Sequence, residues 1–298
     1  GIAGWDALPA SEKARVASTP ILYLHQSVGQ DLEDGAEAVG VKFQYYGKDA
    51  TGVAPGPNGG LFADVGPIDN GKPFEKLALI ERLAARHAGK LRVMAFSFGY
   101  ADVRDSDLAR VQAEYERVAG AVKRSGAVMV HVTPPLVFDV AENRPKMAMR
   151  TWMLARFAGE PIFDLQDVES RDGAARCEVG GVWRICPSVR STAACPSKSQ
   201  GVDGDGQGHL CERKAAVLAK ALLYTFALAT RWYALGDLNY QDDELLFFWF
   251  GQRMHDGLLP YVDLWDRKPP SLFLLYYLFA AISRSVYVFQ LAALALRQ

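Results

Sequence analysis

The first 230 residues alternate short apolar segments with longer amphipathic ones, and this alternation constrains the fold more than any other feature. Strands are predicted at residues 20–25, 42–46, 92–98, 127–133 and 161–165. Helices are predicted at residues 30–38, 73–88, 105–124, 143–157 and 211–230. Strands that alternate with helices form a parallel sheet covered on both faces. We therefore expect an α/β fold, a three-layer α/β/α sandwich with a parallel five-stranded sheet.

The composition fits a folded protein and gives no sign of a nucleic-acid partner. Half of the 298 residues are hydrophobic, 22% are charged, and the formal net charge is −1. A chain of this balance lacks the basic field that attracts a phosphate backbone. The five histidines form no clustered ligand set, so we expect neither a metal nor another cofactor.

The character of the chain changes after residue 230, and we predict two domains, 1–230 and 231–298. The second is rich in tryptophan and in apolar runs, of which 245–250, 271–282 and 286–296 are the longest. Each run is shorter than the ~20 residues that span a bilayer, but residues 272–296 taken together are long enough. The lengths leave a membrane span and a buried hairpin open. We expect a hydrophobic helical segment that associates with a membrane.

All four cysteines, Cys177, Cys186, Cys195 and Cys211, lie in one window near glycines and prolines. Such a set is typical of disulfides that tie loops together in an oxidising compartment. A zinc site is the rival interpretation, but the chain has no C-x-x-C pair. Reduced cysteines in a cytosolic protein are the third. We expect disulfides, and hence an extracytoplasmic location.

A serine and a histidine distant in sequence form the candidate site. Ser27 follows the first predicted strand and precedes a helix, where nucleophilic serines are commonly held. Asp205 and His209 share a glycine-rich loop that leads into the last helix of the domain. Taken separately, Ser27 could cap its helix, and Asp203 and Asp205 could stabilise a turn. Together they supply the groups of a Ser/His/Asp triad.

These residues resemble the SGNH/GDSL hydrolases, in particular a branch with a His-Gln-Ser-Val-Gly nucleophile motif. The resemblance covers about residues 8–225, and rests on residues 26–29, 98–102 and the Asp205/His209 pair. It implies a flavodoxin-like fold and an esterase that removes O-acyl groups, for example acetyl groups from cell-envelope carbohydrate. It makes Ser27 the nucleophile, His209 the base and Asp205 the orienting acid. It implies that the backbone N–H groups of Ser27, Gly60 and Gly99 are the oxyanion donors.

The sequence departs from the family pattern at two places. Ala101 stands where the family has an oxyanion asparagine, and Asp205 precedes His209 by four residues rather than three. Loss of one oxyanion donor lowers rates by about 10²–10³-fold where it has been measured. Because the spacing between Asp205 and His209 is unusual, Asp203 is an alternative carboxylate. Because of both departures, a catalytically degenerate binding domain is an alternative function.

Residues 237–298 are similar to the first extracytoplasmic loop of GT-C membrane glycosyltransferases, which use polyprenyl-phosphate sugars. The similarity rests on Asp243, Glu244 and the Asp-Arg-Lys-Pro-Pro string that begins at Asp266. It implies that Asp243 is the candidate base. Carboxylates before an apolar helix also serve as simple caps. A fragment of such a transferase is thus a further alternative for the function.

Overall fold

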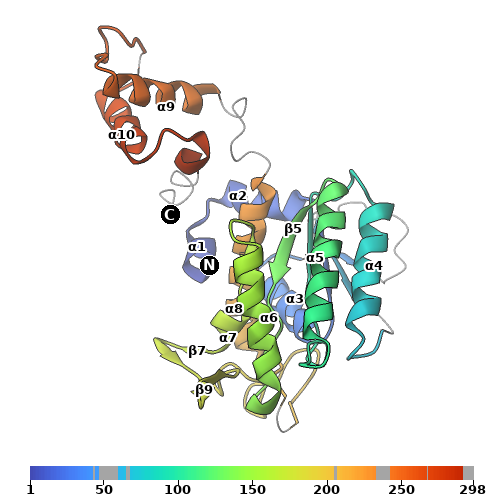
Figure 1. Ribbon diagram of the computed structural model, residues 1–298. Coiled ribbons are helices and arrows are strands. Elements are labelled where there is room, and N and C mark those ends of the chain that lie inside the picture. Colours follow the sequence, from blue (N-terminus) through green and yellow to red (C-terminus); the bar gives the residue numbers. More distant parts are fainter. Residues whose placement is uncertain are drawn as a thin grey trace. The chain divides into compact units, whose positions relative to one another are not determined.

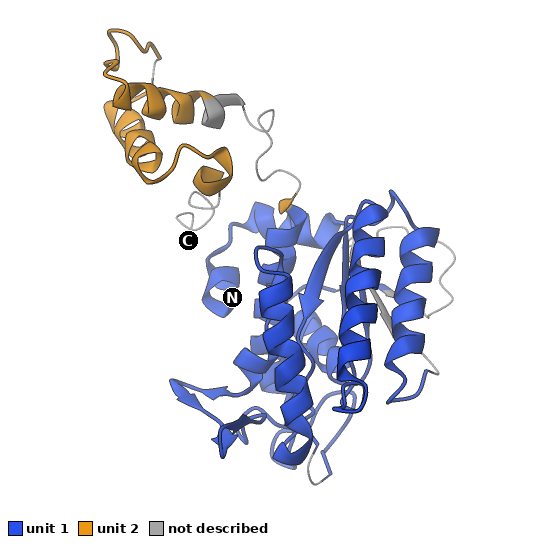
Figure 2. Ribbon diagram, viewed as in Figure 1, with its two compact units in different colours: residues 1–230 blue, residues 231–298 orange. Residues whose placement is uncertain are grey.

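The computed structural model describes residues 1–42, 44–46, 60–64, 68–204, 207–232, 242–266 and 268–290. The chain divides into two compact units, Gly1–Thr230 and Arg231–Gln298 (Figure 2). Each unit is described by itself below.

Unit 1 is built on a parallel sheet, as the alternating pattern predicts. Its strands are β1 (Ile21–His25), β2 (Gln44–Tyr46), β3 (Gly60–Asp64), β4 (Val93–Phe96), β5 (Val128–Val132) and β6 (Ile162–Phe163). They lie in the order β2-β3-β1-β4-β5-β6, with every pairing parallel. The expected number of five strands is wrong by one, because β3 was not predicted. Its short Gly-Leu-Phe-Ala-Asp sequence follows a glycine- and proline-rich stretch that is typical of a loop.

The helices of unit 1 that cover the sheet lie in two groups, one on each face. The described helices of this unit are α1 (Ile2–Ala7), α2 (Ala10–Ser18), α3 (Val28–Ala38), α4 (Pro73–Arg86), α5 (Leu108–Arg124), α6 (Asn143–Arg156), α7 (Leu165–Glu169) and α8 (Glu212–Thr230), with a 3₁₀ turn at Val140–Glu142. Figure 1 shows α4, α5 and α6 on one face of the sheet, and α3 and α8 on the other.

Alternation of side chains along β1 explains why both faces need a covering helix. Leu22 and Leu24 point into the apolar core shared with α4 and α5. Tyr23 points the other way, where its ring meets Phe226 of α8, and His25 reaches Glu33 of α3 on that same face. Successive residues of a strand face opposite sides, so every residue of β1 is buried on one face or the other.

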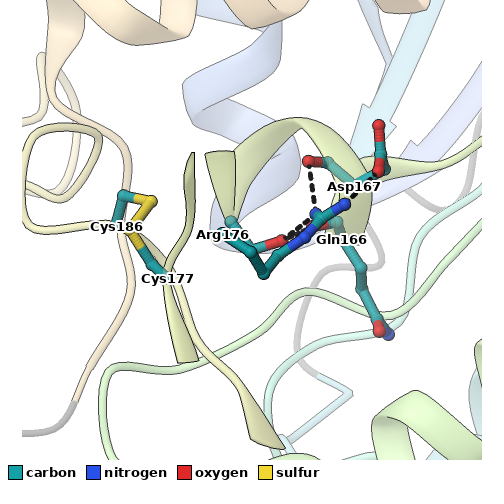
Figure 3. Close-up of a disulfide and its surroundings, with 6 residues drawn as sticks. Gln166, Asp167, Arg176, Cys177 and Cys186 are labelled. Carbon is teal, nitrogen blue, oxygen red and sulfur yellow. Dashed lines mark hydrogen bonds and ion pairs between the residues drawn. A yellow bond between two sulfur atoms is a disulfide. The ribbon is translucent and has the colours of Figure 1, made fainter. Parts of the chain in front are cut away.

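Two disulfides close the segment between α7 and α8, so the prediction of disulfides is confirmed. They join Cys177 to Cys186 and Cys195 to Cys211. The short strands β7 (Arg171–Asp172), β8 (Ala175–Arg176), β9 (Glu178–Val179) and β10 (Val182–Trp183) form two small hairpins here. Beside the first disulfide, Arg176 reaches back to Asp167 of α7 with an Nη2–Oδ1 distance of 2.7 Å (Figure 3).

Unit 2 contains a helical hairpin, α9 (Asp242–His255) and α10 (Pro270–Ile282). The two helices share an aromatic core that includes Phe247, Phe250, Phe273 and Tyr276. Gly251 permits their close approach, because a Cβ there would lie 2.3 Å from the carbonyl oxygen of Tyr276.

Residues 272–296 do not form the single long helix considered from the sequence. The helix α10 ends at Ile282, and Ser283 has an extended backbone. Within the described residues, no helix is both long and apolar enough to cross a bilayer.

Candidate functional site

Ser27 lies in a sharp turn between β1 and α3. Its backbone has φ 59° and ψ −104°, a left-handed conformation that L-residues other than glycine rarely adopt. Only one other non-glycine residue in the described part of the chain has a positive φ. The residue occupies the N-cap position of α3, yet its side chain makes no capping hydrogen bond. The strained turn instead directs the hydroxyl outward, beyond the carboxyl end of β1.

The Ser27 hydroxyl meets the imidazole of His209. The Oγ–Nε2 distance is 3.1 Å across a sequence separation of 182 residues. The His209 backbone is held on both sides, because its N–H donates to Asp203 Oδ2 and its carbonyl accepts from the Ser191 N–H. The Tyr100 ring packs against the imidazole in a T-shaped arrangement, with ring centroids 5.4 Å apart. The structure thus brings together the predicted nucleophile and the predicted base.

The carboxylate that faces the imidazole belongs to Asp31. His209 Nδ1 lies 3.0 Å from Asp31 Oδ2, which also accepts from the Leu210 N–H at 2.9 Å. Asp31 is 1% exposed. With a carboxylate at Nδ1, that nitrogen carries the proton and Nε2 is free to accept the hydroxyl proton of Ser27. Ser27, His209 and Asp31 therefore form a continuous chain of hydrogen bonds in the order that a catalytic triad requires.

Neither of the two carboxylates predicted as the orienting acid, Asp205 and Asp203, is seen to face the His209 ring among the described residues. Asp205 lies outside the described residues. Asp203 does not face the imidazole ring: it binds the His209 backbone N–H and forms an ion pair with Arg190 at 3.3 Å. Burial raises the pKa of Asp203, although His209 and Arg190 oppose the shift.

Sequence reasoning missed Asp31, although one signal pointed to it. Ser27 and Asp31 are four residues apart, on either side of the start of the helix predicted at residues 30–38. Residues four apart lie on the same helical face, one turn apart. The acid can therefore reach the histidine that contacts the nucleophile.

The predicted oxyanion glycines do not converge on Ser27. Gly60 pairs with Ile21, at the beginning of β1, whereas Ser27 follows the end of that strand. Gly60 therefore lies at the amino end of the parallel strands, whereas Ser27 lies beyond their carboxyl end, and Gly60 cannot serve as an oxyanion donor. The Gly99 N–H donates to Asp102 Oδ2 at 2.6 Å, so it is already engaged. The first N–H groups of a helix have no intrahelical partner, which leaves the amino end of α3 at Ser27 as the nearest source of donors.

A buried ion pair supports the loops around the site. Lys76 and Asp102 are both fully buried, with an Nζ–Oδ2 distance of 2.6 Å. Lys76 also donates to Gln26 Oε1 at 2.6 Å, directly before Ser27. The other Asp102 oxygen accepts from the Gly71 N–H at 2.9 Å. A buried pair is stable when its remaining hydrogen-bonding sites are filled in this way. Sequence reasoning did not single out Lys76, and it included Asp102 only as part of residues 98–102, without a role.

The side chain of Asn70 packs against Gly99, beside the Lys76–Asp102 ion pair. Its Oδ1 would be 2.7 Å from a Cβ placed on Gly99. The short loop that carries Asn70 is fixed on both sides, since Gln26 Nε2 donates to the Ile68 carbonyl at 3.3 Å and the Gly71 N–H binds Asp102. Ala101, by contrast, has no side-chain donor, and its carbonyl accepts from Arg104.

In unit 2, Asp243 and Glu244 belong to α9, but their side chains lie outside the described part of the chain. The clearest surface feature is an apolar face on α10, opposite its aromatic core. Its exposed members are Leu274, Leu275, Leu278 and Ile282.

Comparisons with known proteins do not place the chain in a family. No protein-family model matches it, and no curated protein matches it either.

Proposed function

We propose that unit 1 is a serine hydrolase that cleaves an ester. The observation that supports this most directly is the hydrogen-bonded series Ser27–His209–Asp31. Its contacts are 3.1 Å and 3.0 Å long, within the range expected of a nucleophile, its base and the group that orients the base. The strained backbone of Ser27 supports the same conclusion, because such strain concentrates at functional sites.

In the proposed reaction, Ser27 Oγ attacks the acyl carbonyl while its proton passes to His209 Nε2. Asp31 stabilises the imidazolium that forms and keeps the ring in its orientation. The proton then moves from His209 to the leaving alkoxide, which departs as an alcohol and leaves an acyl-Ser27 ester. A water molecule, deprotonated by His209, hydrolyses that ester and restores the serine.

The negative charge on the tetrahedral oxygen needs at least two preorganised donors. We assign these to the backbone N–H of Ser27, at the positive end of α3, and to the side-chain amide of Asn70. Asn70 is on the loop after β3 that Gln26 and Asp102 hold in place, and in this proposal it supplies the side-chain donor that Ala101 lacks.

The family resemblance and the location complete the proposal. We infer a three-layer α/β/α domain of SGNH type, which acts on O-acyl groups such as acetyl esters of cell-envelope carbohydrate. Two disulfides support an oxidising, extracytoplasmic location. The exposed apolar face of α10 supports association of unit 2 with a membrane surface.

The test is hydrolysis of p-nitrophenyl acetate, together with labelling by a fluorophosphonate probe and mass spectrometry of the labelled peptide. The wild-type protein should turn over the ester and carry the label on Ser27. Ser27→Ala should abolish labelling and lower kcat by about 10³-fold or more. Equal hydrolysis by wild type and variant would overturn the assignment of the nucleophile. A folded wild type that neither hydrolyses esters nor takes the label would favour a binding domain.

A further inference from the structure

Asp31 is held from two sides, and the second side lies outside the triad. While Oδ2 faces His209 and Leu210, Oδ1 accepts a hydrogen bond from the hydroxyl of Ser197. Ser197 is 2% exposed and lies 166 residues from Asp31 in sequence. Both carboxylate oxygens are therefore fixed, one by the segment that carries His209 and one by the segment that carries Ser197.

The direction of the Ser197 hydrogen bond is set by its own loop. Ser197 Oγ accepts from the Gln200 N–H at 3.0 Å, so the hydroxyl hydrogen is available for Asp31. The loop is closed by two backbone hydrogen bonds between Ser197 and Gly201, of 2.8 and 3.0 Å. The backbone of Ser197 is fixed by the hydrogen bonds to Gly201, and its hydroxyl oxygen is fixed by the Gln200 N–H. The hydroxyl is thus a preorganised donor to Asp31.

The disulfide Cys195–Cys211 joins the two segments that hold Asp31. Cys195 precedes Ser197 by two residues, and Cys211 follows His209 by two residues. Both sulfur-bearing residues are buried. A covalent link at this place fixes the distance between the donor to Oδ1 and the donor to Oδ2.

We propose that Ser197 is a positioning residue for the catalytic carboxylate, and that the Cys195–Cys211 disulfide holds it there, so that full activity requires this disulfide. The proposal rests on the hydrolase function proposed above. Ser197 acts through Asp31 and touches no reacting atom. Without it, Asp31 keeps its contact to His209 but loses the hydrogen bond that orients its second oxygen.

The first test compares Ser197→Ala with Ser199→Ala. Ser199 is on the same loop, but its hydroxyl binds Asp34 on the exposed side of α3. We expect Ser197→Ala to lower kcat about 10- to 100-fold with little change in KM, as for the loss of a hydrogen bond to a charged group. Ser199→Ala should retain wild-type kcat. Unchanged kcat in a correctly folded Ser197→Ala protein would overturn the proposal, and so would a loss confined to KM.

A second readout does not depend on turnover. The proton that His209 Nδ1 donates to Asp31 should give a separate low-field ¹H NMR signal. Ser197→Ala should shift or broaden this signal, whereas Ser199→Ala should leave it in place. If the wild type shows no esterase activity but the signal responds to Ser197, only the proposed function fails. If the wild type is active and the signal ignores Ser197, only the positioning role fails.

The second test removes one disulfide at a time. The Cys195→Ser/Cys211→Ser protein should lose at least about 10-fold in kcat, by the same loss of orientation at Asp31. The matched control is Cys177→Ser/Cys186→Ser, which opens the disulfide beside Arg176 and Asp167 (Figure 3). Within the described residues, neither Cys177 nor Cys186 contacts a member of the triad, so this variant should retain its kcat.

Circular dichroism of each variant establishes that it is folded before rates are compared. For a double variant that does not fold, graded reduction of the wild-type protein replaces it, with mass spectrometry to show which disulfide has opened. Activity should fall in step with opening of Cys195–Cys211. Activity that persists after this disulfide has opened would overturn its role.

Discussion

At the scale of single residues, Ser27 combines a reactive position with an unfavourable backbone. A positive φ costs a serine of order 1–3 kcal/mol, whereas glycine adopts it without a Cβ clash. The cost is retained in the fold because the same turn presents the hydroxyl to His209.

Ser27→Gly should therefore be more stable than Ser27→Ala by about 1 kcal/mol, because only glycine relieves the strain. Both variants lack the nucleophile and should be equally inactive. Urea unfolding of the two proteins measures the difference. Equal stabilities would mean that the turn stores no strain.

Asn70→Ala tests the second oxyanion donor. Its removal should lower kcat by about 10²–10³-fold and leave KM nearly unchanged, because the donor acts on the charge that develops in the transition state. Asp69→Ala is the matched control and should retain kcat, because Asp69 is one position earlier and its carboxylate pairs with Lys72 at the surface. A rise in KM alone for Asn70→Ala would assign Asn70 to ground-state binding.

The candidate site shows which residues a sequence can reveal. Ser27 lies between an apolar strand and a helix, and His209 follows a glycine-rich loop, and both patterns are conspicuous in a sequence. Asp31 lies inside a helix, where a carboxylate is ordinarily a solvent-facing residue, so only the packing of α3 under the His209 loop gives it a role. The Lys76–Asp102 ion pair was not predictable from the sequence either, because the two residues become buried only when distant segments pack together in the folded chain.

At the scale of elements, α3 and α8 pack closely because of a glycine. A Cβ on Gly35 would lie 2.2 Å from the carbonyl oxygen of Ala215, and a backbone atom cannot move aside as a flexible side chain does. The same helix carries Ser27 and Asp31 at its start, so its position on α8 determines where the triad lies.

Gly35→Ala should destabilise unit 1 by about 1–3 kcal/mol through overpacking. Gly120→Ala in α5 is the control, because among the described residues its new Cβ meets only the end of the Arg124 side chain, at 3.3 Å. That variant should gain up to about 1 kcal/mol from helix propensity. Chemical denaturation of both proteins provides the comparison, and a neutral Gly35→Ala would show that the two helices can separate at little cost.

A buried histidine links β5 to its neighbours and makes stability depend on pH. His131 Nδ1 lies 3.0 Å from the Tyr115 hydroxyl, and Nε2 lies 3.1 Å from Glu160, which Lys123 also binds. Burial lowers the pKa of His131, although Glu160 opposes the shift. Burial alone would raise the pKa of Glu160, but hydrogen bonds from His131 and Lys123 bring it to about 2.

Both shifts make the folded protein bind fewer protons than the unfolded chain. Stability should therefore fall as the pH drops below about 6.5, where His131 titrates in the unfolded chain, and again from about 4.5 to about 2 as Glu160 is protonated. His131→Phe should reduce the first loss, so its Tm should change less between pH 7.5 and pH 5 than that of the wild type. Parallel Tm curves would exclude His131 as the cause.

At the scale of the whole molecule, the proposed chemistry is confined to unit 1. Ser27, Asp31, Ser197 and His209 all precede Thr230, at which the unit ends. Unit 2 contributes an apolar surface, including Trp265, which is 73% exposed. The parallel α/β architecture was predictable because alternation of strands and helices is a local pattern. The break at Ser283 was not, because an apolar run shows its length but not where its helix ends.

A chain that ends at residue 230 should retain kcat within about twofold of the full chain, since it keeps the complete hydrogen-bonded series of unit 1. The full chain should bind vesicles of neutral lipid more strongly than the shortened chain does. Sedimentation with such vesicles and p-nitrophenyl acetate hydrolysis test the two statements separately. A large loss of kcat in the folded shorter chain would give unit 2 a part in catalysis.

Because the proposed triad comes from two distant segments of the chain, the site can form only late in synthesis. Synthesis delivers the nucleophile and its acid within the first turns of α3, but the base only some 180 residues later. A nascent chain therefore holds its serine without a proton acceptor until the last part of unit 1 has emerged. Oxidation of Cys195 and Cys211 then follows in the compartment where thiols pair. The proposed hydrolase would thus reach its full activity only after this disulfide has formed.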